Sequence, residues 1–378
     1  MKRILVFLLA VWVLAGSVTA AEPEVAGKAV ILMDAATGTI LYESNAHEQL
    51  APASVTKVMT MLLIMEAIDG GQLRWDDPVT ASEAAAAKGG SQVYLKAGET
   101  MTVADMVKSI AVSSANDCAC AMAEHIAGSE AAFVEKMNQR AAELGMADTH
   151  FVNCTGLDDD PTAKDHKTSA HDIAVMSREL LANHPDIKQY TTIWMDTIRD
   201  GAFGLSNTNK MVRYYPGCTG LKTGFTSSAG YCLSASAARD GLELIAVVLG
   251  ADTSPNRFAA CKSLLDYGFA NYALYSPAMQ EGASVPVTLG QSESVAVIPE
   301  TAPQLLVEKS KLNAITSEVT LEPSVDAPVA QGRKPGMLTV KAGEELLAEI
   351  PLVAETAVER LGFPAVMGMV LRKVAMAK

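Results

Sequence analysis

The chain is poor in aromatic and charged side chains. Phenylalanine, tryptophan and tyrosine make up 5% of its 378 residues, and charged residues make up 19%. An excess of positive charge is also missing, because the formal net charge is −13 at pH 7. Such an acidic chain repels phosphate backbones, which argues against nucleic acid as a partner. With 49% hydrophobic residues, the chain is long enough to bury a sizeable core in two domains.

Two common metal-binding patterns are absent. The sequence has no CxxC pair, and none of its six histidines stands in an HExxH motif. We therefore expect no metal and no cofactor. Two interpretations of the cysteines remain open. They could form disulfides in an oxidising compartment, or they could be small buried apolar residues. The six cysteines are Cys118, Cys120, Cys154, Cys218, Cys232 and Cys261.

The N-terminus has the pattern of a secretory signal peptide. Lys2 and Arg3 precede an apolar run, and the small residues Val18, Thr19 and Ala20 form a cleavage site. The sequence predicts a signal peptide over residues 1–20 and an exported mature chain. A retained membrane anchor is the alternative, but its apolar core would be short.

Residues 21–275 show strand patterns near both ends and helical patterns between them. The sequence therefore predicts an α/β (α+β) domain of about this extent. The hairpin pattern covers 27–46, the helical patterns cover 52–68, 100–128, 129–146 and 171–184, three strands follow in 220–251, and a closing helix covers 256–272.

Two further segments follow this domain. Short alternating strands between turns predict a small all-β domain over residues 280–353. In the tail, residues 355–378, apolar side chains share one helical face while basic residues lie elsewhere. The tail is too short to span a bilayer. We expect a helix on the membrane surface, with a helix packed on the protein as the alternative.

Ser54 and Lys57 form an SxxK motif at the start of a predicted helix. Residues i and i+3 share a helical face, so the two side chains can meet within hydrogen-bond distance. A serine becomes a good nucleophile when a base removes its proton, and a lysine is a base only when burial or a nearby cation lowers its pKa. The motif alone is weak, because a capping serine followed by a surface lysine has the same spacing.

Two later motifs strengthen this interpretation. Ser114-Ala115-Asn116 lies at a predicted helix junction, and Lys222-Thr223-Gly224 lies on a predicted strand. Together with Ser54 and Lys57, they resemble the SxxK, SxN and KTG set of penicillin-binding proteins and serine β-lactamases. With the flanking segments and the C-terminal β-region, the chain resembles the low-molecular-mass D-alanyl-D-alanine carboxypeptidases over nearly its whole mature length.

This resemblance implies a penicillin-binding-protein/β-lactamase-like transpeptidase fold, with an antiparallel sheet and a helical subdomain in residues 21–275. It implies a serine-type D-alanyl-D-alanine carboxypeptidase that forms an acyl-enzyme at Ser54. The implied catalytic residues are Ser54, Lys57 and Ser114, and the implied substrate-binding residues are Asn116, Lys222, Thr223, Gly224, Phe225 and Arg257. The backbone amides of Ser54 and Phe225 would form the oxyanion hole, and Arg257 would lie near the substrate carboxylate.

The implied partners are the peptidoglycan stem peptide, β-lactams as covalent inhibitors, and the membrane surface at the outer face of the cytoplasmic membrane. Two alternatives are a serine β-lactamase and a non-catalytic peptidoglycan-binding protein. The loop "CTGLDDDPTAKD" lacks a glutamate, which disfavours the β-lactamase, and the complete motif set disfavours the non-catalytic protein. The residue that activates the deacylating water, and the preference between carboxypeptidase and endopeptidase, remain open.

Overall fold

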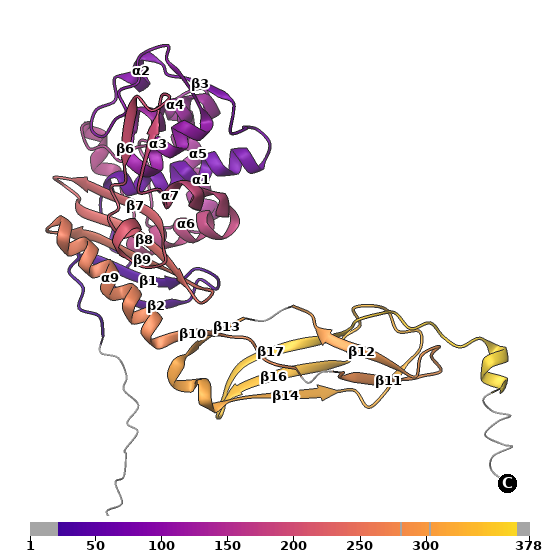
Figure 1. Ribbon diagram of the computed structural model, residues 1–378. Coiled ribbons are helices and arrows are strands. Elements are labelled where there is room, and N and C mark those ends of the chain that lie inside the picture. Colours follow the sequence, from indigo (N-terminus) through magenta and orange to yellow (C-terminus); the bar gives the residue numbers. More distant parts are fainter. Residues whose placement is uncertain (1–21, 280–281, 302–303, 369–378) are drawn as a thin grey trace, which may run out of the picture. The chain divides into compact units, whose positions relative to one another are not determined.

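The computed structural model describes residues 22–279, 282–301 and 304–368. The predicted signal peptide and the last ten residues of the predicted tail helix lie outside this range. The chain divides into two compact units, Glu22–Ala270 and a second that begins at Asn271 (Figure 1). Each unit is described separately below.

The first unit is built around a five-stranded antiparallel sheet with the strand order β2-β1-β9-β8-β7. The predicted N-terminal hairpin thus joins the three strands predicted in residues 220–251. All six residues of β1 are buried, because helices cover both faces of the sheet. The strands are β1 (Ala29–Asp34), β2 (Ile40–Ser44), β7 (Cys218–Thr226), β8 (Gly230–Arg239) and β9 (Leu242–Ala251).

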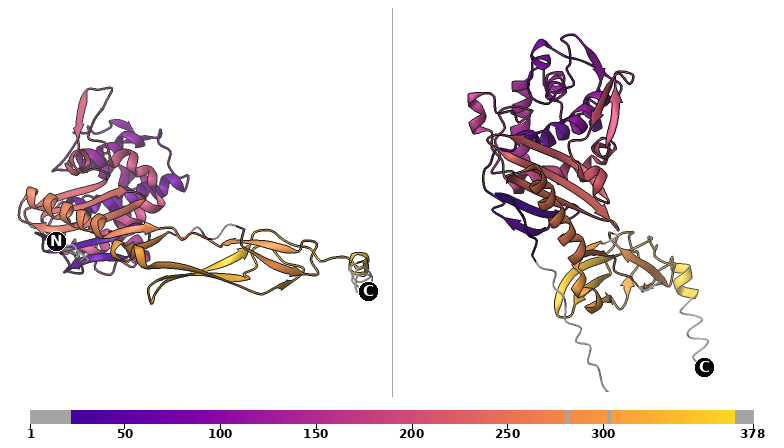
Figure 2. Two further views of the ribbon diagram at one scale, coloured as in Figure 1. Left: turned by 60° about the horizontal axis from the view of Figure 1, so that its bottom comes forward. Right: turned by 60° about the vertical axis from the view of Figure 1, so that its left-hand side comes forward.

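Helix α9 covers one face of the sheet, and a helical cluster covers the other (Figure 2). On α9, Gly268 allows close packing, because an added Cβ would lie 2.4 Å from the side chain of Leu244. Helix α1 is apolar on nearly every side and lies within the cluster. The longer helices are α1 (Lys57–Asp69), α3 (Val103–Ser113), α4 (Asn116–Ala127), α5 (Glu130–Glu143), α6 (Ala170–Asn183) and α9 (Ser254–Asn271).

Short elements complete this unit. Two small two-stranded antiparallel sheets are formed by β3 with β4 and by β5 with β6. The remaining elements are η1 (Ala53–Thr56), β3 (Pro78–Thr80), α2 (Glu83–Ala86), β4 (Thr100–Thr102), η2 (Pro161–Asp165), η3 (Pro185–Ile187), α7 (Lys188–Thr191), β5 (Met195–Ile198), β6 (Phe203–Ser206) and α8 (Met211–Tyr214).

The second unit is mostly β-structure, as the alternating pattern predicts. Six strands form a sheet in the order β14-β16-β17-β12-β11-β15, and β10 pairs with β13. Its core contains valine, leucine, isoleucine and alanine side chains. The elements are β10 (Tyr272–Tyr275), β11 (Ser284–Thr288), β12 (Ser294–Pro299), β13 (Leu305–Glu308), η4 (Lys309–Ala314), β14 (Ile315–Leu321), β15 (Val325–Asp326), β16 (Gly336–Ala342) and β17 (Glu345–Ala354).

The described part of the tail is helical only at residues 363–368, and 355–362 are not helical. Phe363 is 77% exposed and Met367 is 46% exposed. Among the described residues, no helix combines the length and the apolar character that a membrane span requires.

Candidate active site

Ser54 and Lys57 lie in contact where η1 passes into α1. The Nζ atom of Lys57 lies 2.9 Å from Ser54 Oγ and donates a hydrogen bond of 2.8 Å to the backbone carbonyl of Thr155. Lys57 is completely buried. The amide of Ser54 belongs to the first turn of η1, so no carbonyl within that helix can accept its N–H. The predicted pair is therefore assembled beside a backbone N–H that has no acceptor within its own helix.

Burial gives Lys57 the property that the chemistry requires. Loss of hydration lowers the pKa of its amine from 10.5 to about 7, and the electrostatic influence of Cys154 and Asp117 opposes this shift. A large fraction of the amine is therefore neutral at neutral pH. With a neutral amine, the Ser54 hydroxyl can donate its proton to the Nζ lone pair.

A second set of contacts holds the turn before Ser54 in an uncommon conformation. Ala53 has a φ of +48°, and the Thr56 hydroxyl donates to its carbonyl at 2.8 Å. Nδ1 of His166 accepts from the amide of Val152, so the ring hydrogen is on Nε2, which lies 2.8 Å from Thr56 Oγ1. Burial lowers the pKa of His166 to about 4, which keeps this ring neutral. His166 thus braces the turn through Thr56.

Ser114 and Asn116 lie at the junction of α3 and α4, where the sequence predicts two helices to meet. Ser114 has a φ of +63°, which ends α3 and reorients the chain. Its Oγ atom and Asn116 Oδ1 are buried and have no hydrogen-bond partner among the described residues. Asn116 Nδ2 donates to the carbonyl of Gly89 at 2.7 Å. Unpaired buried polar atoms are costly, so these two are suited to a ligand's polar groups.

Strand β7 carries the KTG motif and packs against η1. Lys222 is 1% exposed, and its Nζ donates to the carbonyl of Thr223 at 3.0 Å. Burial lowers the pKa of Lys222 well below its ordinary value, and repulsion by Lys57 and Arg257 adds to this shift. A Cβ at Gly224 would lie 2.6 Å from the carbonyl of Pro52 and 3.1 Å from the amide of Ser54. Glycine is therefore required for this close approach of β7 to Ser54.

Arg257 and Phe225 lie at the same end of the sheet. Nη1 of Arg257 donates to the carbonyls of Gly224 and Cys232, at 2.8 and 3.3 Å, and its guanidinium lies over the Tyr231 ring. In this structure Arg257 therefore supports β7 from the protein side. Phe225 is 52% exposed, and its ring centroid lies 4.3 Å from that of Tyr231.

The loop at residues 153–156 supports Lys57 through a contact that the sequence did not predict. Asn153 Oδ1 accepts from the amides of Thr155 and Gly156, which positions the Thr155 carbonyl. The carboxylate of Glu130 accepts from both the amide and the thiol of Cys154. Every residue has a backbone carbonyl, so the sequence does not show which carbonyl will contact Lys57. The one available signal was the asparagine-to-glycine spacing of a tight turn.

Comparison with known proteins agrees with this geometry. The D-alanyl-D-alanine carboxypeptidase family profile matches residues 16–253, and the profile of the penicillin-binding protein 5 C-terminal domain matches 275–360. D-alanyl-D-alanine carboxypeptidase DacF of Bacillus subtilis is 42% identical over 342 residues, which cover 89% of this chain and 87% of DacF. DacC of Escherichia coli is 32% identical over 94% of this chain and 90% of its own length.

Solved structures show the same fold. Penicillin-binding protein 5 from Haemophilus influenzae aligns with a TM-score of 0.75 and 29% identity, over 90% of this chain and all of that chain. Penicillin-binding protein D2 from Listeria monocytogenes, in its ampicillin-bound form, aligns with a TM-score of 0.59 and 33% identity, over 65% of this chain and 98% of that chain. This chain therefore belongs to the D-alanyl-D-alanine carboxypeptidase family of low-molecular-mass penicillin-binding proteins.

Proposed function

We propose that this protein removes the terminal D-alanine from peptidoglycan stem pentapeptides through an acyl-enzyme at Ser54, and that β-lactams acylate the same residue. The observation that carries the proposal is the 2.9 Å contact between Ser54 Oγ and an amine whose pKa burial lowers to about 7. Family membership supports a serine peptidase. The alternatives of a β-lactamase and a non-catalytic binding protein are not favoured.

In the proposed acylation step, Ser54 transfers its proton to Lys57 and attacks the carbonyl of the penultimate D-alanine. The amides of Ser54 and Phe225 stabilise the oxyanion, which is a large source of rate enhancement in acyl transfer. The Ser114 hydroxyl, which has no partner among the described residues, relays the proton from Lys57 to the departing D-alanine nitrogen. Water then releases the shortened peptide.

In the proposed binding mode, the stem peptide extends along β7, the edge strand of the sheet. Asn116 binds the amide beside the scissile bond, and Thr223 lines the strand. The terminal carboxylate of the substrate favours protonation of Lys222, whose amine is held weakly basic by burial. The resulting ammonium stabilises the carboxylate and repels a proton on Lys57, so substrate binding itself promotes the neutral base.

In the cell, the proposed location is the outer face of the cytoplasmic membrane. The sequence predicts export by residues 1–20 and surface attachment by the tail. The exposed Phe363 and Met367 at the described start of the tail helix support the second point. Sedimentation of the mature protein with anionic lipid vesicles, compared with a chain that ends at residue 354, tests this attachment.

Two measurements test the activity. Release of D-alanine from diacetyl-Lys-D-Ala-D-Ala should depend on Ser54, and the intact mass should increase by one penicillin after exposure to the antibiotic. A folded protein that gains no mass would refute the proposal. Sustained hydrolysis of nitrocefin would instead identify a β-lactamase, and release of crosslinked fragments without D-alanine would identify an endopeptidase.

A further inference from the structure

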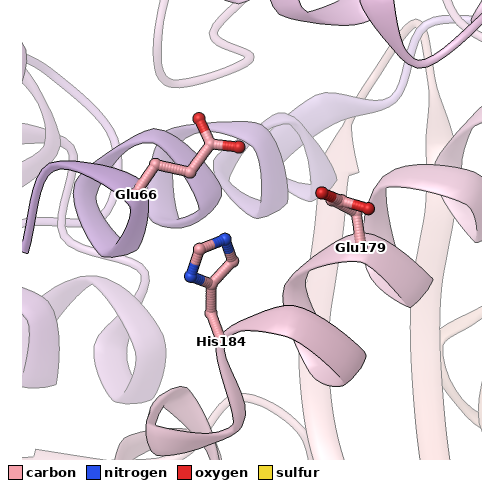
Figure 3. Close-up of side chains that lie close together, drawn as sticks. All are labelled: Glu66, Glu179 and His184. Atoms are coloured by element: carbon pink, nitrogen blue, oxygen red, sulfur yellow. The ribbon is translucent and has the colours of Figure 1, made fainter. Parts of the chain in front are cut away.

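Three side chains that can bind metal ions gather on the helical cluster at the far end of α1 from the SxxK motif. Glu66 lies on α1, Glu179 lies on α6, and His184 follows the last residue of α6. One ligand atom from each lies within 4.8 Å of the other two. Figure 3 shows both carboxylates and one ring nitrogen directed toward a common space.

The orientation of His184 provides the key observation. Its Nδ1 is hydrogen-bonded to the carboxylate of Asp69, and the residue is 8% exposed. An ionised carboxylate can only accept, so Nδ1 carries the ring hydrogen. The other nitrogen, Nε2, then presents a lone pair toward the oxygens of Glu66 and Glu179 (Figure 3). A lone pair and two carboxylates that converge on one point attract a positive ion, and a metal ion can bind to all three groups.

Arg140 supplies one positive charge to this cluster. Its Nε donates to Glu66 Oε1 and its Nη2 donates to Glu179 Oε1, both at 2.7 Å. These bonds use one oxygen of each carboxylate, and the second oxygens accept no hydrogen bond from the described residues. Glu143 also contacts the guanidinium. Because several carboxylates surround one arginine and a histidine, the site retains an excess of negative charge.

We propose that Glu66, Glu179 and His184 bind a divalent transition-metal ion of the Zn²⁺ class. One imidazole and two carboxylates are a donor set that suits Zn²⁺, with water completing the coordination. Asp69 plays the outer-shell role common at such sites, where a carboxylate fixes the orientation of a ligating histidine. The ion would join the C-terminal half of α1 to the end of α6. It would stabilise the unit that holds Ser54 and Lys57 and would take no part in the reaction.

Zinc binding by the mature full-length chain, purified without a histidine tag, tests this proposal. Titration calorimetry and elemental analysis should give one Zn²⁺ per chain, and His184→Asn and Glu179→Gln should each abolish that binding. Glu143→Gln is the matched control, because it alters the same arginine network outside the cluster. His47→Asn is the second control, because the rings of His47 and His171 stack at 4.5 Å and offer a competing surface site. Both controls should retain the ion.

A thermal measurement gives a second readout. Free Zn²⁺ at about 100 times its Kd should raise the unfolding temperature by roughly 5–10 °C, because the ion binds only the folded chain. Asp69→Asn should weaken binding by about 10–100-fold without abolishing it. Acylation by penicillin shows that each variant is folded. Any of three results would overturn the proposal. The wild-type chain could fail to bind zinc, or the folded His184→Asn variant could retain it. Nitrogen NMR in excess zinc could also show both ring nitrogens of His184 protonated.

Discussion

The two units of this protein differ in what they bury. The catalytic unit, Glu22–Ala270, fully buries several charged or titratable side chains, including Lys57, Asp117, His166 and Lys222. In the described part of the second unit, every buried side chain is hydrophobic. Removing a charged or polar group from water costs folding free energy unless partners compensate. The described part of the second unit buries no charged side chain and so does not incur this cost, whereas the first unit does.

The difference identifies which unit carries the chemistry. A lysine with a pKa of about 7 and buried polar atoms without partners add nothing to folding, yet they are what acyl transfer needs. The second unit resembles an ordinary β-structure stabilised by hydrophobic contacts. Five predictions test this contrast, from the largest expected effect on acylation to the smallest.

Substitution Ser54→Ala should remove covalent labelling by penicillin and lower D-alanine release by about 10⁴-fold or more, because the nucleophile is lost. Intact mass spectrometry and D-alanine assay measure the two effects. Thermal unfolding should change little, since the Ser54 side chain is partly exposed. Activity that survives in this variant would place the nucleophile elsewhere.

Substitution Lys57→Met should also abolish acylation but should stabilise the fold. Lowering the amine pKa from 10.5 to about 7 costs about 5 kcal/mol of folding free energy at neutral pH. The substitution also removes the hydrogen bonds of Lys57, which destabilises the fold by about 2 kcal/mol. We therefore expect the free energy of unfolding to rise by roughly 3 kcal/mol, as measured by denaturant unfolding. The matched control is Lys341→Met on the exposed face of β16, which should change stability by less than about 0.5 kcal/mol. Equal changes in stability from Lys57→Met and Lys341→Met would contradict the difference between the two units.

The acylation rate should depend on pH through Lys57. Its amine must be neutral to accept the serine proton, so the rate should fall about tenfold per pH unit below pH 7 and level off above it. The second-order rate constant for labelled penicillin between pH 5 and 9 measures this dependence. A profile that is flat across this range would exclude Lys57 as the base.

Substitution His166→Ala should slow acylation by about 10–100-fold, because the Thr56 hydroxyl loses the hydrogen bond from the ring and the turn that presents Ser54 relaxes. Substitution His166→Gln should recover most of the rate, since its amide nitrogen can reach the Thr56 hydroxyl. Stability alone does not distinguish this role, so the recovery of the acylation rate by glutamine is the decisive comparison. Equal losses in both variants would reduce His166 to a packing residue.

Substitution Leu338→Ala in the core of the second unit should cost about 2–5 kcal/mol of that unit's stability and leave the acylation rate unchanged. Calorimetry of the full chain and penicillin labelling at 25 °C measure the two quantities. A slower acylation by the variant would show that the second unit contributes to the catalytic geometry.

Much of the fold follows from local patterns. The hairpin of β1 and β2, the three strands β7 to β9 and the helices on either side of Ser114 were predicted, because alternation and helical periodicity are short-range signals. Arg257 illustrates where such reasoning stops. The resemblance implied a position near the substrate carboxylate, but its hydrogen bonds to two strand carbonyls are known only from the structure.

The sequence alone determined which residue types can perform the reaction, because the spacing of Ser54 and Lys57 is set by one helical turn and the other motifs have a recognisable order. Only the tertiary structure decided the state of those residues. Burial sets the pKa of Lys57, and a backbone carbonyl about a hundred positions away in the sequence holds its amine. Hydration and long-range contacts are properties of the packed chain, so they leave no local pattern. For the same reason, the sequence did not predict that Glu66, Glu179 and His184 lie close together.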